Sequence, residues 1–330
     1  MTSAAQDAAS WLANPRATRE TLEAFGLATK HRLGQNFLVE DNIIRKIIRL
    51  AELTSDDVVL EVGPGLGTLT VAMLDYVRAV CSIEADRELE GVLATTCKEP
   101  HQDSFVLCMG DALKATPQLV GDAYASLGVF ADAQGKEASG ALIGPNKFVS
   151  NLPYQVAATL ILLFFQEFTT LEQAIVMVQA EVADRILAKP KTKAYGAYTA
   201  KLALYAQVSG RFEVAPGNFM PPPRVNSAVV RLERAPMTDP SGTSVLTSEQ
   251  LFWVARVIDA AFAQRRKTIR NSMGASGFKK DTLERALLAA HIEPTVRAEA
   301  LGVKDFVRLA MALAEGGAYG EETAFVHGRR

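Results

Sequence analysis

Short apolar runs alternate with stretches of helical periodicity over the first part of the chain. Runs bounded by polar residues or glycine predict buried strands at Val58–Val62, Ala79–Ile83 and Phe105–Met109. Apolar positions that recur three or four residues apart predict helices around these strands, at Asn42–Leu53, Leu66–Tyr76 and Arg87–Thr96. Strands that alternate with helices predict a parallel sheet covered by helices on both faces.

The alternation resumes after an irregular stretch. Thr116–Asn146 is rich in Ala, Gly and Asp and has weak periodicity, so we expect a surface insertion there. Beyond it the pattern predicts strands at Phe148–Ser150, Ala174–Val178, Arg211–Val214 and Ser227–Leu232, and helices at Val156–Phe165, Glu181–Ala188 and Tyr198–Val208. The fold class is therefore α/β.

The last part of the chain has a purely helical pattern. Ala235–Ser248 is rich in Pro, Ser, Thr and Gly, which is typical of a linker. An apolar stripe from Leu251 to Phe262 follows, then Asp281 and Glu284 at capping-box spacing and a helical stretch at Asp305–Ala314. We expect an N-terminal arm at 1–29, an α/β domain at 30–235 with an insertion at about 116–146, a linker at 236–248 and a helical domain at 249–330.

Composition and charge narrow the class of protein. The 330 residues include 35 Lys and Arg against 37 Asp and Glu, a formal net charge of −2, and 48% are apolar. This is the composition of a folded globular protein, and it excludes attachment to nucleic acid by net charge while allowing a local basic patch. No apolar run approaches the roughly 20 residues that span a bilayer, and the N-terminus lacks the apolar core of a secretory signal. We therefore expect a cytoplasmic protein with no membrane partner.

Cysteine and histidine form no recognisable metal or catalytic pattern. Cys81, Cys97 and Cys108 match no zinc spacing, and their odd number argues against a disulfide framework, so we expect small buried thiols. The histidines are scattered along the chain. The sequence therefore predicts no metal site.

Three polar groups follow three successive predicted strands. The first strand ends in Glu61-Val-Gly63-Pro-Gly65-Leu-Gly67, whose spacing differs from the dinucleotide fingerprint and from the phosphate-binding P-loop. This spacing indicates a nucleoside ligand in place of a pyrophosphate. Glu84 closes the second strand, where a carboxylate accepts the two hydroxyls of a ribose, and Asp111 closes the third, where a carboxylate accepts from an adenine amine. Each feature alone is typical of an ordinary turn or strand end.

Asn151-Leu152-Pro153-Tyr154 follows the strand Phe148–Ser150. The lone pair of an adenine amine is delocalised into its ring, so the amine is a poor nucleophile until acceptors on its N–H groups localise that pair. The Asn151 side-chain oxygen and the Leu152 backbone carbonyl are suitable acceptors. Pro153 fixes the turn without adding a donor, and the Tyr154 ring stacks on an extruded base. Without the other motifs, this segment also fits a proline turn beside a packed aromatic residue.

A basic segment follows the Leu251–Phe262 stripe. It contains Arg265, Arg266, Lys267 and Arg270, and residues 251–330 hold 13 Lys and Arg against 9 Asp and Glu. Clustered cations at a helix end contact phosphates, although a solvated helix terminus gives the same pattern.

The ordered set of motifs resembles the bacterial small-subunit (16S) ribosomal RNA adenine N6,N6-dimethyltransferases, over about Lys30 to Ala314. The set consists of Gly34-Gln-Asn-Phe-Leu38, the glycine loop, Gly110-Asp-Ala112, the Asn151 to Tyr154 turn, Phe219-Met-Pro-Pro-Pro-Arg224-Val-Asn-Ser227 and Gln264-Arg-Arg-Lys-Thr-Ile-Arg-Asn271. This resemblance implies a seven-stranded Rossmann-like methyltransferase sheet with a small helical C-terminal domain. It also implies S-adenosylmethionine as methyl donor, with no metal required.

The resemblance further implies roles for individual residues. Asn36 and Leu38 border the donor, Gly63 and Gly65 approach its methionine part, Glu84 binds its ribose and Asp111 its adenine amine. Asn151 faces both donor and target amine, with Leu152 and Pro153 in the same catalytic turn, and Tyr154 and Phe219 sandwich the target base. The RNA-binding residues are Arg265, Arg266, Lys267, Arg270 and Arg224, and His31 and Arg32 extend that surface.

The expected reaction is dimethylation of N6 of two adjacent adenines near the 3′ end of 16S rRNA, within the small ribosomal subunit or its precursor, by a monomer. One alternative is the related large-subunit (23S) rRNA adenine N6-methyltransferase of the macrolide-resistance type. Another is an assembly factor whose binding role dominates. The long N-terminal arm, the stretch at 116–146 and the tail after Glu315 depart from the family pattern without removing a motif residue.

Overall fold

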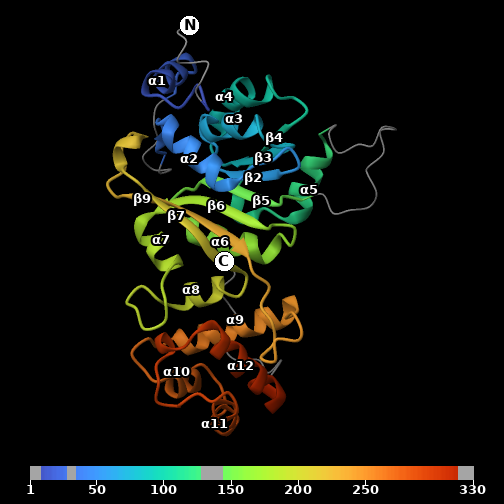
Figure 1. The fold of residues 1–330 in the computed structure, drawn as a ribbon, viewed down its shortest axis with the longest axis vertical. Coiled ribbons are helices and arrows are strands. Elements are labelled where there is room, and N and C mark those ends of the chain that lie inside the picture. The colour runs from blue at the N-terminus through green and yellow to red at the C-terminus, as the bar shows by residue number, and fades with distance from the viewer. Residues whose placement is uncertain (1–8, 28–34, 128–143, 319–330) are drawn as a thin grey trace. The chain divides into compact units, whose positions relative to one another are not determined.

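A computed structural model of the chain describes residues 9–27, 35–127 and 144–318 (Figure 1). Its central sheet has seven strands in the order β4-β3-β2-β5-β6-β9-β7. Their bounds are β2 Val58–Val62, β3 Ala79–Glu84, β4 Phe105–Met109, β5 Lys147–Asn151, β6 Gln173–Gln179, β7 Ala206–Val214 and β9 Ser227–Arg234. The strands from β4 to β6 are parallel, and β9 runs antiparallel to β6. The predicted seven-stranded Rossmann-like sheet is confirmed.

The strand order reverses between β2 and β5, so the chain leaves β2 in one direction along the sheet and returns to its other side. In open parallel sheets such a reversal opens a crevice at the carboxyl ends of the strands. The residues that follow β2, β3, β4 and β5 all lie at this edge. The topology therefore brings together four segments that the sequence spreads over about ninety residues.

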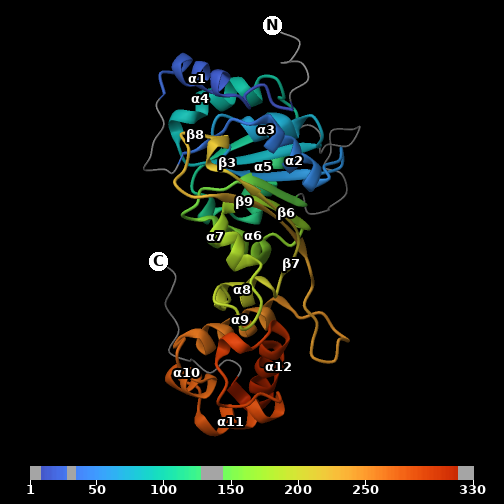
Figure 2. The same ribbon diagram turned by 60° about the vertical axis from the view of Figure 1, so that its left-hand side comes forward.

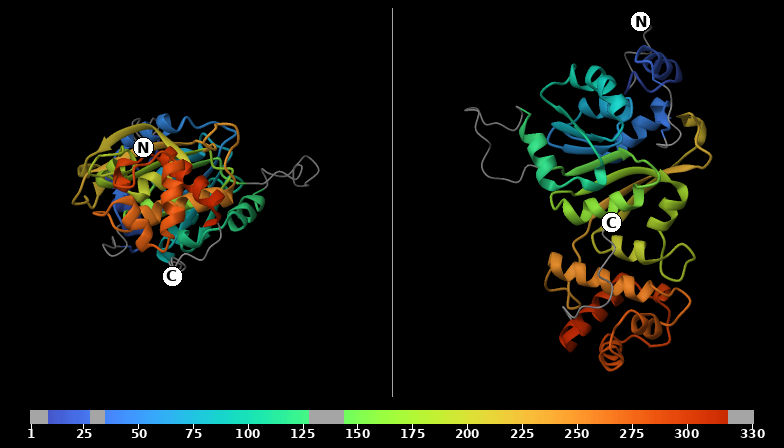
Figure 3. Two further views of the ribbon diagram at one scale, coloured as in Figure 1. Left: turned by 90° about the horizontal axis from the view of Figure 1, so that it is seen from below. Right: turned by 180° about the vertical axis from the view of Figure 1, so that it is seen from behind.

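Helices cover both faces of the sheet, as the views in Figures 2 and 3 show. One apolar cluster joins the sheet to α2 (Asp41–Ala51), α3 (Thr68–Leu74) and α4 (Glu90–Leu93). The opposite face carries α5 (Pro117–Ala125) and α6 (Ala157–Glu167), where the Phe164 ring contacts Phe148 of β5. Burial on both faces explains why every residue of β2 is apolar except Glu61.

The stretch at 116–146 is not only a surface insertion, contrary to the sequence analysis. Thr116 accepts a hydrogen bond from the Leu119 N–H and starts α5, with Pro117 in the first turn. Tyr124 is fully buried, and its hydroxyl donates to the backbone carbonyl of Val59 at 2.7 Å. Val120, Tyr124 and Leu127 are thus part of the core, although Leu119 of the same helix is exposed. Residues 128–143 of the predicted insertion lie outside the described residues.

Two other local predictions are wrong. The predicted helix Tyr198–Val208 is divided into α8 (Ala197–Leu202) and the start of β7, because pairing with β9 continues the sheet. The capping box predicted at Asp281 is absent, since α11 (Lys280–Ala289) begins one residue earlier and has no side-chain cap.

The N-terminal segment contributes a helix and a strand. α1 (Pro15–Ala24) starts at Asn14, whose side chain accepts from the Ala17 N–H, and it buries Leu22. β1 (Phe37–Leu38) pairs antiparallel with β8 (Phe219–Met220), so Leu38 lies opposite Phe219. This two-stranded ribbon lies beside the carboxyl-end crevice because Phe37 contacts the glycine loop.

The structure contains two compact units, Met1–Ala183 with Val208–Arg234, and Asp184–Gln207 with Ala235–Arg330. The second unit thus includes 184–207, which the sequence analysis placed in the α/β domain. Its helices, besides α8 and α11, are α9 (Ser248–Phe262), α10 (Ile269–Ala275) and α12 (Val303–Leu313). Thr247 and Gln250 form a capping box at α9, and the Trp253 indole donates to the Ala310 carbonyl at 2.8 Å, joining α9 to α12. α7 (Ala180–Ile186) crosses the boundary between the units. Within the described ranges, no helix has the length and apolar character to cross a bilayer.

Candidate active site

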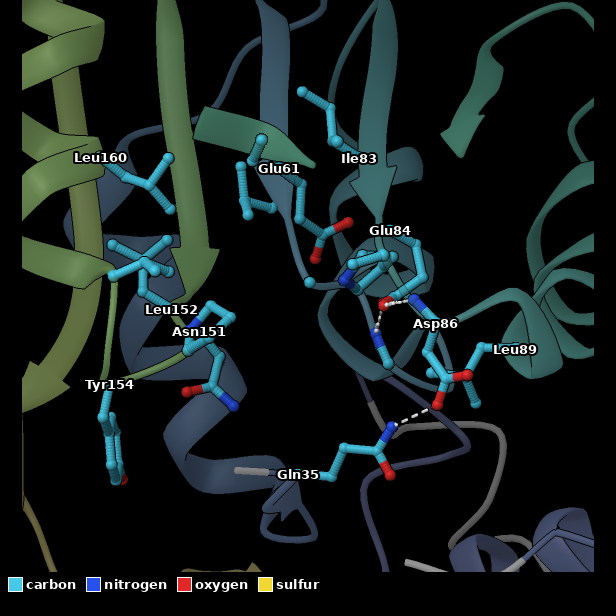
Figure 4. A pocket seen from close by; sticks show the side chains of 18 of the residues that line it. Gln35, Glu61, Ile83, Glu84, Asp86, Leu89, Asn151, Leu152, Tyr154 and Leu160 are labelled. Carbon is cyan, nitrogen blue, oxygen red and sulfur yellow. Dashed lines mark hydrogen bonds between the residues drawn. The ribbon is translucent and has the colours of Figure 1, made fainter. Parts of the chain in front are cut away.

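A cavity of about 280 Å³ lies at the carboxyl ends of β2, β3, β4 and β5 (Figure 4). It brings together most of the residues that the sequence analysis singled out. These are Asn36, Leu38, Gly63, Gly65, Glu84, Asp111, Asn151, Leu152, Pro153 and Tyr154. The four polar strand ends therefore form one site.

The glycine loop leaves little room for side chains at its three glycines. A Cβ on Gly67 would lie only 2.5 Å from Cys97 Sγ, and Gly63 and Gly65 are also tightly surrounded. Gly63 and Gly65 have φ of +68° and +63°, in the left-handed region that favours glycine. A Cβ on Gly63 would lie 3.3 Å from Pro153 Cγ, and one on Gly65 would lie 3.1 Å from Phe37 Cε1. The loop thus contacts both the Asn151 to Tyr154 turn and the N-terminal strand, and it leaves bare backbone facing the cavity.

Glu84 ends β3 with its carboxylate turned to the loop. One oxygen accepts from the Asp86 N–H at 2.8 Å, and the other lies 3.4 Å from the Gly65 nitrogen, which donates to it (Figure 4). The side chain is buried, which raises its pKa above the ordinary value, while the backbone donors oppose that shift. The carboxylate is therefore fixed in position before any ligand arrives.

Asp111 follows β4 at the exposed side of the cavity. Its Oδ1 accepts from the Leu113 N–H at 3.0 Å, which caps a short 3₁₀ helix at Ala112–Lys114. Its other oxygen accepts no hydrogen bond from the part of the chain that the structure describes, and so it is available to a ligand.

Two carboxyl groups in the cavity were not identified as site residues from sequence. Asp86 accepts a 2.9 Å hydrogen bond from the Gln35 side chain, which ties the N-terminal segment to the end of β3. No local pattern could reveal a pair separated by 51 residues. Glu61 is 1% exposed and accepts from the hydroxyls of Thr70 and Ser82, both at 2.7 Å. Burial raises the pKa of Glu61 to about 7.

Glu61 did carry a sequence signal. It is a lone acid inside an otherwise apolar strand, directly before the glycine loop. Burying a carboxyl group without hydrogen-bond partners would be strongly disfavoured, so the two hydroxyl donors stabilise Glu61 in this position. Its carboxyl group lies beneath the loop, beside the cavity (Figure 4).

The Asn151 to Tyr154 turn forms the wall opposite Glu84 (Figure 4). The Asn151 amide nitrogen donates to the Asn36 carbonyl at 3.4 Å, which leaves its side-chain oxygen as an acceptor. The Leu152 N–H donates to Met177 of β6 at 3.1 Å, and the Leu152 carbonyl accepts from none of the described residues. The Asn151 side-chain oxygen and the Leu152 carbonyl, two acceptors from consecutive residues, thus lie at the same wall of the cavity.

Tyr154 and Phe219 have different surroundings. The Tyr154 hydroxyl exchanges a 2.6 Å hydrogen bond with the buried Ser227 hydroxyl, which holds the half-buried ring at the cavity wall. Phe219 is only 3% exposed, belongs to the apolar cluster under the sheet and does not line the cavity. The structure therefore brings Tyr154 into the site, whereas Phe219 lies in the apolar cluster, opposite Leu38 in the β1–β8 pair.

The charge of the lining selects the class of ligand. Four of the described lining residues are acids, Glu61, Glu84, Asp86 and Asp111, and none is Lys, Arg or His. A site of this kind repels phosphate and favours a cationic nucleoside. Among the residues described, no group of three or more His, Cys, Asp or Glu is placed to hold a metal ion.

The predicted RNA-binding residues that the structure describes do not line the cavity. Arg265, Arg266 and Lys267 are exposed in the turn between α9 and α10, and Arg270 is in the first turn of α10. Arg224 is exposed in the segment after β8. His31, Arg32 and Gly34 lie outside the described residues.

Comparisons with known proteins identify this arrangement. The family model described as ribosomal RNA adenine dimethylase matches residues 26–315. The chain is 38% identical to the "Ribosomal RNA small subunit methyltransferase A" of Kineococcus radiotolerans over 307 residues, 92% of this chain and 93% of that protein. It is 38% identical to the protein of the same name in Streptomyces coelicolor, over 91% of this chain and 96% of that protein.

Solved structures share the fold at lower identity. A dimethyladenosine transferase from Plasmodium falciparum superposes with a TM-score of 0.65 at 21% identity, covering 85% of this chain and 98% of that one. The 23S rRNA methyltransferase ErmE gives 0.57 at 24% identity, covering 84% of this chain and 100% of that one. At these identities the likeness shows the fold alone. From the family match and the bacterial relatives, we conclude that the chain is a methyltransferase and belongs to the ribosomal RNA adenine dimethylase family.

Proposed function

We propose that the protein dimethylates N6 of two adjacent adenines near the 3′ end of 16S rRNA, with S-adenosylmethionine as methyl donor. The bacterial relatives named small subunit methyltransferase A support the choice of RNA. The observation that carries the chemistry is the pair of unused acceptors, the Asn151 side-chain oxygen and the Leu152 carbonyl, in a cavity whose described charged lining residues are all acids.

The residues present fit the donor. Glu84 is held where it accepts from ribose hydroxyls, and the free oxygen of Asp111 accepts from the adenine amine. The bare backbone at Gly63 and Gly65, with Asn36 and Leu38 on the facing segment, leaves space for the methionine part. When bound, S-adenosylmethionine supplies a methyl group that its positively charged sulfur has already activated.

The Asn151 to Tyr154 turn binds and activates the target amine. Acceptance of its two N–H groups by Asn151 and Leu152 localises the nitrogen lone pair and stabilises the ammonium that forms on alkylation. Pro153 holds the turn against Gly63, and the Tyr154 ring stacks on the extruded base. A strong general base is unnecessary, because the proton leaves readily once the nitrogen carries the methyl group.

Binding of the particle falls to the basic residues. Arg265, Arg266, Lys267, Arg270 and Arg224 contact phosphates of 16S rRNA within the small subunit or its precursor. The enzyme acts as a cytoplasmic monomer in small-subunit biogenesis.

The test of this function is transfer of radiolabelled methyl groups to purified ribosomal subunits that lack adenine dimethylation. We expect label on small subunits and none on large ones. Label on the large subunit alone would move the protein to the resistance-type branch. Donor binding without transfer to either subunit would contradict the proposed reaction and favour a role in assembly.

A further inference from the structure

Two basic segments about seventy residues apart in the sequence lie side by side in the helical unit. One is the loop Lys189–Tyr195, with exposed lysines at 189, 191 and 193. The other is the turn after α9, with Arg265, Arg266 and Lys267. The Arg265 Nη2 donates to the backbone carbonyls of Lys193 at 2.9 Å and Tyr195 at 3.5 Å, so the turn directly holds the loop.

The loop is fixed by further contacts. Tyr195 is buried, donates its hydroxyl to the Leu301 carbonyl at 2.8 Å and packs its ring near Phe262 of α9. The Lys191 N–H donates to the Glu299 carbonyl at 2.8 Å. The three lysines therefore project from an ordered backbone, and little conformational entropy remains to be lost in presenting them.

Lys191 has φ of +71°, in the left-handed region where lysine is uncommon and Asn or Gly is favoured. A non-glycine residue in this region is strained and persists where the surrounding contacts hold its backbone. At this position the side chain is an exposed cation on an anchored loop.

The surroundings leave these charges uncompensated. Neither the loop nor the turn contains an acid. The Glu299 carboxylate lies 4.0 Å from Arg265 and is shared with Arg297, from which it lies 3.8 Å. Within the described ranges, Lys189, Lys191, Lys193, Arg266 and Lys267 form no ion pair. Binding of a polyanion reduces the repulsion between the positive charges of such a cluster.

We propose that the three loop lysines join Arg265, Arg266 and Lys267 in one RNA phosphate-binding surface, and that Arg265 also acts as a positioning residue that holds the loop. This rests on the proposed function only in that the polyanion is RNA. Flexible ammonium groups without aromatic neighbours contact the backbone and do not read bases. The surface therefore binds structured RNA irrespective of its sequence.

The test compares Lys191→Asn with Lys98→Asn, which removes the same charge from an exposed site in the other unit. Dissociation constants are measured against 16S and 23S RNA fragments over a series of salt concentrations. For Lys191→Asn we expect about fivefold weaker binding near physiological salt and a slope of log K against log salt reduced by about 0.7 to 0.9. Asn suits the backbone at 191, so thermal stability is unchanged or higher.

Arg265→Ala tests the positioning role in a double-mutant cycle. If Arg265 acts through the loop, adding Lys191→Asn to Arg265→Ala changes affinity less than it does in the wild type. Additive effects would show that Arg265 contributes as a phosphate ligand alone and would overturn its positioning role.

Equal dissociation constants and salt slopes for Lys191→Asn and Lys98→Asn would contradict the proposed RNA-binding surface. The choice of RNA does not enter this comparison. A reduced slope on both RNAs supports the surface even if methyl groups are transferred to the large subunit, and an unchanged slope contradicts it even if the small subunit is the substrate.

Discussion

The side-chain amide of Asn151 donates a 3.4 Å hydrogen bond to the backbone carbonyl of Asn36, across 115 residues of sequence. This contact joins the end of β5 to the N-terminal strand at the cavity wall. Because the nitrogen is directed to Asn36, the oxygen is left for the target amine. This hydrogen bond engages only the amide nitrogen of Asn151. It therefore orients the side chain and leaves its acceptor oxygen unused.

Asn151→Ala removes the acceptor and leaves the donor site intact. We expect the rate constant for methyl transfer to fall by about 10²- to 10³-fold, as when a single transition-state hydrogen-bonding group is lost. Affinity for S-adenosylmethionine, measured by calorimetry, changes much less. Particle binding is unchanged. A variant that retains a tenth of the wild-type rate would show that the Leu152 carbonyl suffices.

Glu84→Gln weakens the charged hydrogen bonds to the ribose. We expect donor affinity to fall by about ten- to a hundredfold, since hydrogen bonds to charged groups contribute about 1.5–3 kcal/mol. The exposed Glu90→Gln serves as the control. Burial raises the pKa of Glu84, so wild-type donor affinity falls as pH decreases through that raised pKa and the carboxylate is neutralised. Titration calorimetry of Glu84→Gln should show no such fall, and a parallel decrease in both proteins would exclude Glu84 as its source.

The sequence was most informative where burial alone decides structure. β2 matches its predicted bounds because it is a short, fully buried run in the middle of the sheet. β4 also matches, as an apolar run bounded by polar residues, although it is the edge strand and only Phe105 is buried. Residues 206–208 were predicted to be helical because the apolar positions before them fit either period, and only pairing with β9 selects the strand. Tyr124 was missed because just two buried positions, Val120 and Tyr124, mark α5.

Glu61→Gln should change how stability depends on pH. The pKa of Glu61 rises from 4.5 to about 7 on folding, so between these values the folded protein holds a proton that the unfolded chain releases. The free energy of unfolding therefore falls as pH rises through this range, by on the order of 3 kcal/mol in total. Gln accepts from Thr70 and Ser82 without ionising.

Chemical denaturation at about pH 5 and pH 8 measures this difference, the two values bracketing the raised pKa. We expect Glu61→Gln to gain stability relative to wild type at the higher pH. Equal differences at both pH values would show that Glu61 titrates normally.

Gly65→Ala places a Cβ 3.1 Å from the Phe37 ring on a backbone with φ of +63°. We expect a loss of about 1–3 kcal/mol in unfolding free energy, from backbone strain and displacement of the ring. Gly110 also lines the cavity, but an added Cβ there meets nothing within 4 Å. Gly110→Ala should therefore be close to neutral in the same denaturation experiment, and similar losses in both would assign the effect to glycine replacement in general.

The sequence predicted that the candidate site is formed by a set of strand ends. It did not predict the contacts between the residues of the site. Glu84, Asp111 and Asn151 were found because parallel strands end at one edge of a sheet. The Gln35–Asp86 bond joins distant segments and has no local signal. Phe219 is buried in the apolar cluster where β1 pairs with β8, and its role at the target base stays a prediction.

Tyr154→Phe and Tyr154→Ala separate the hydroxyl from the ring. The hydroxyl bonds to Ser227, so Tyr154→Phe should lose about 1 kcal/mol of stability and less than tenfold in kcat/KM. Tyr154→Ala removes the stacking face and should lower kcat/KM by a further tenfold or more. Equal kinetics for the two variants would exclude stacking on this ring.

The most direct test of the account is mass-spectrometric mapping of the methylated nucleosides in 16S rRNA after reaction of unmethylated small subunits with the wild-type enzyme and with Asn151→Ala. We predict N6,N6-dimethyladenosine at two adjacent positions near the 3′ end with the wild type and unmodified adenosine with the variant. Methylation at another atom or another site, or an unchanged product pattern with Asn151→Ala, would contradict the assignment of this cavity to adenine N6 dimethylation.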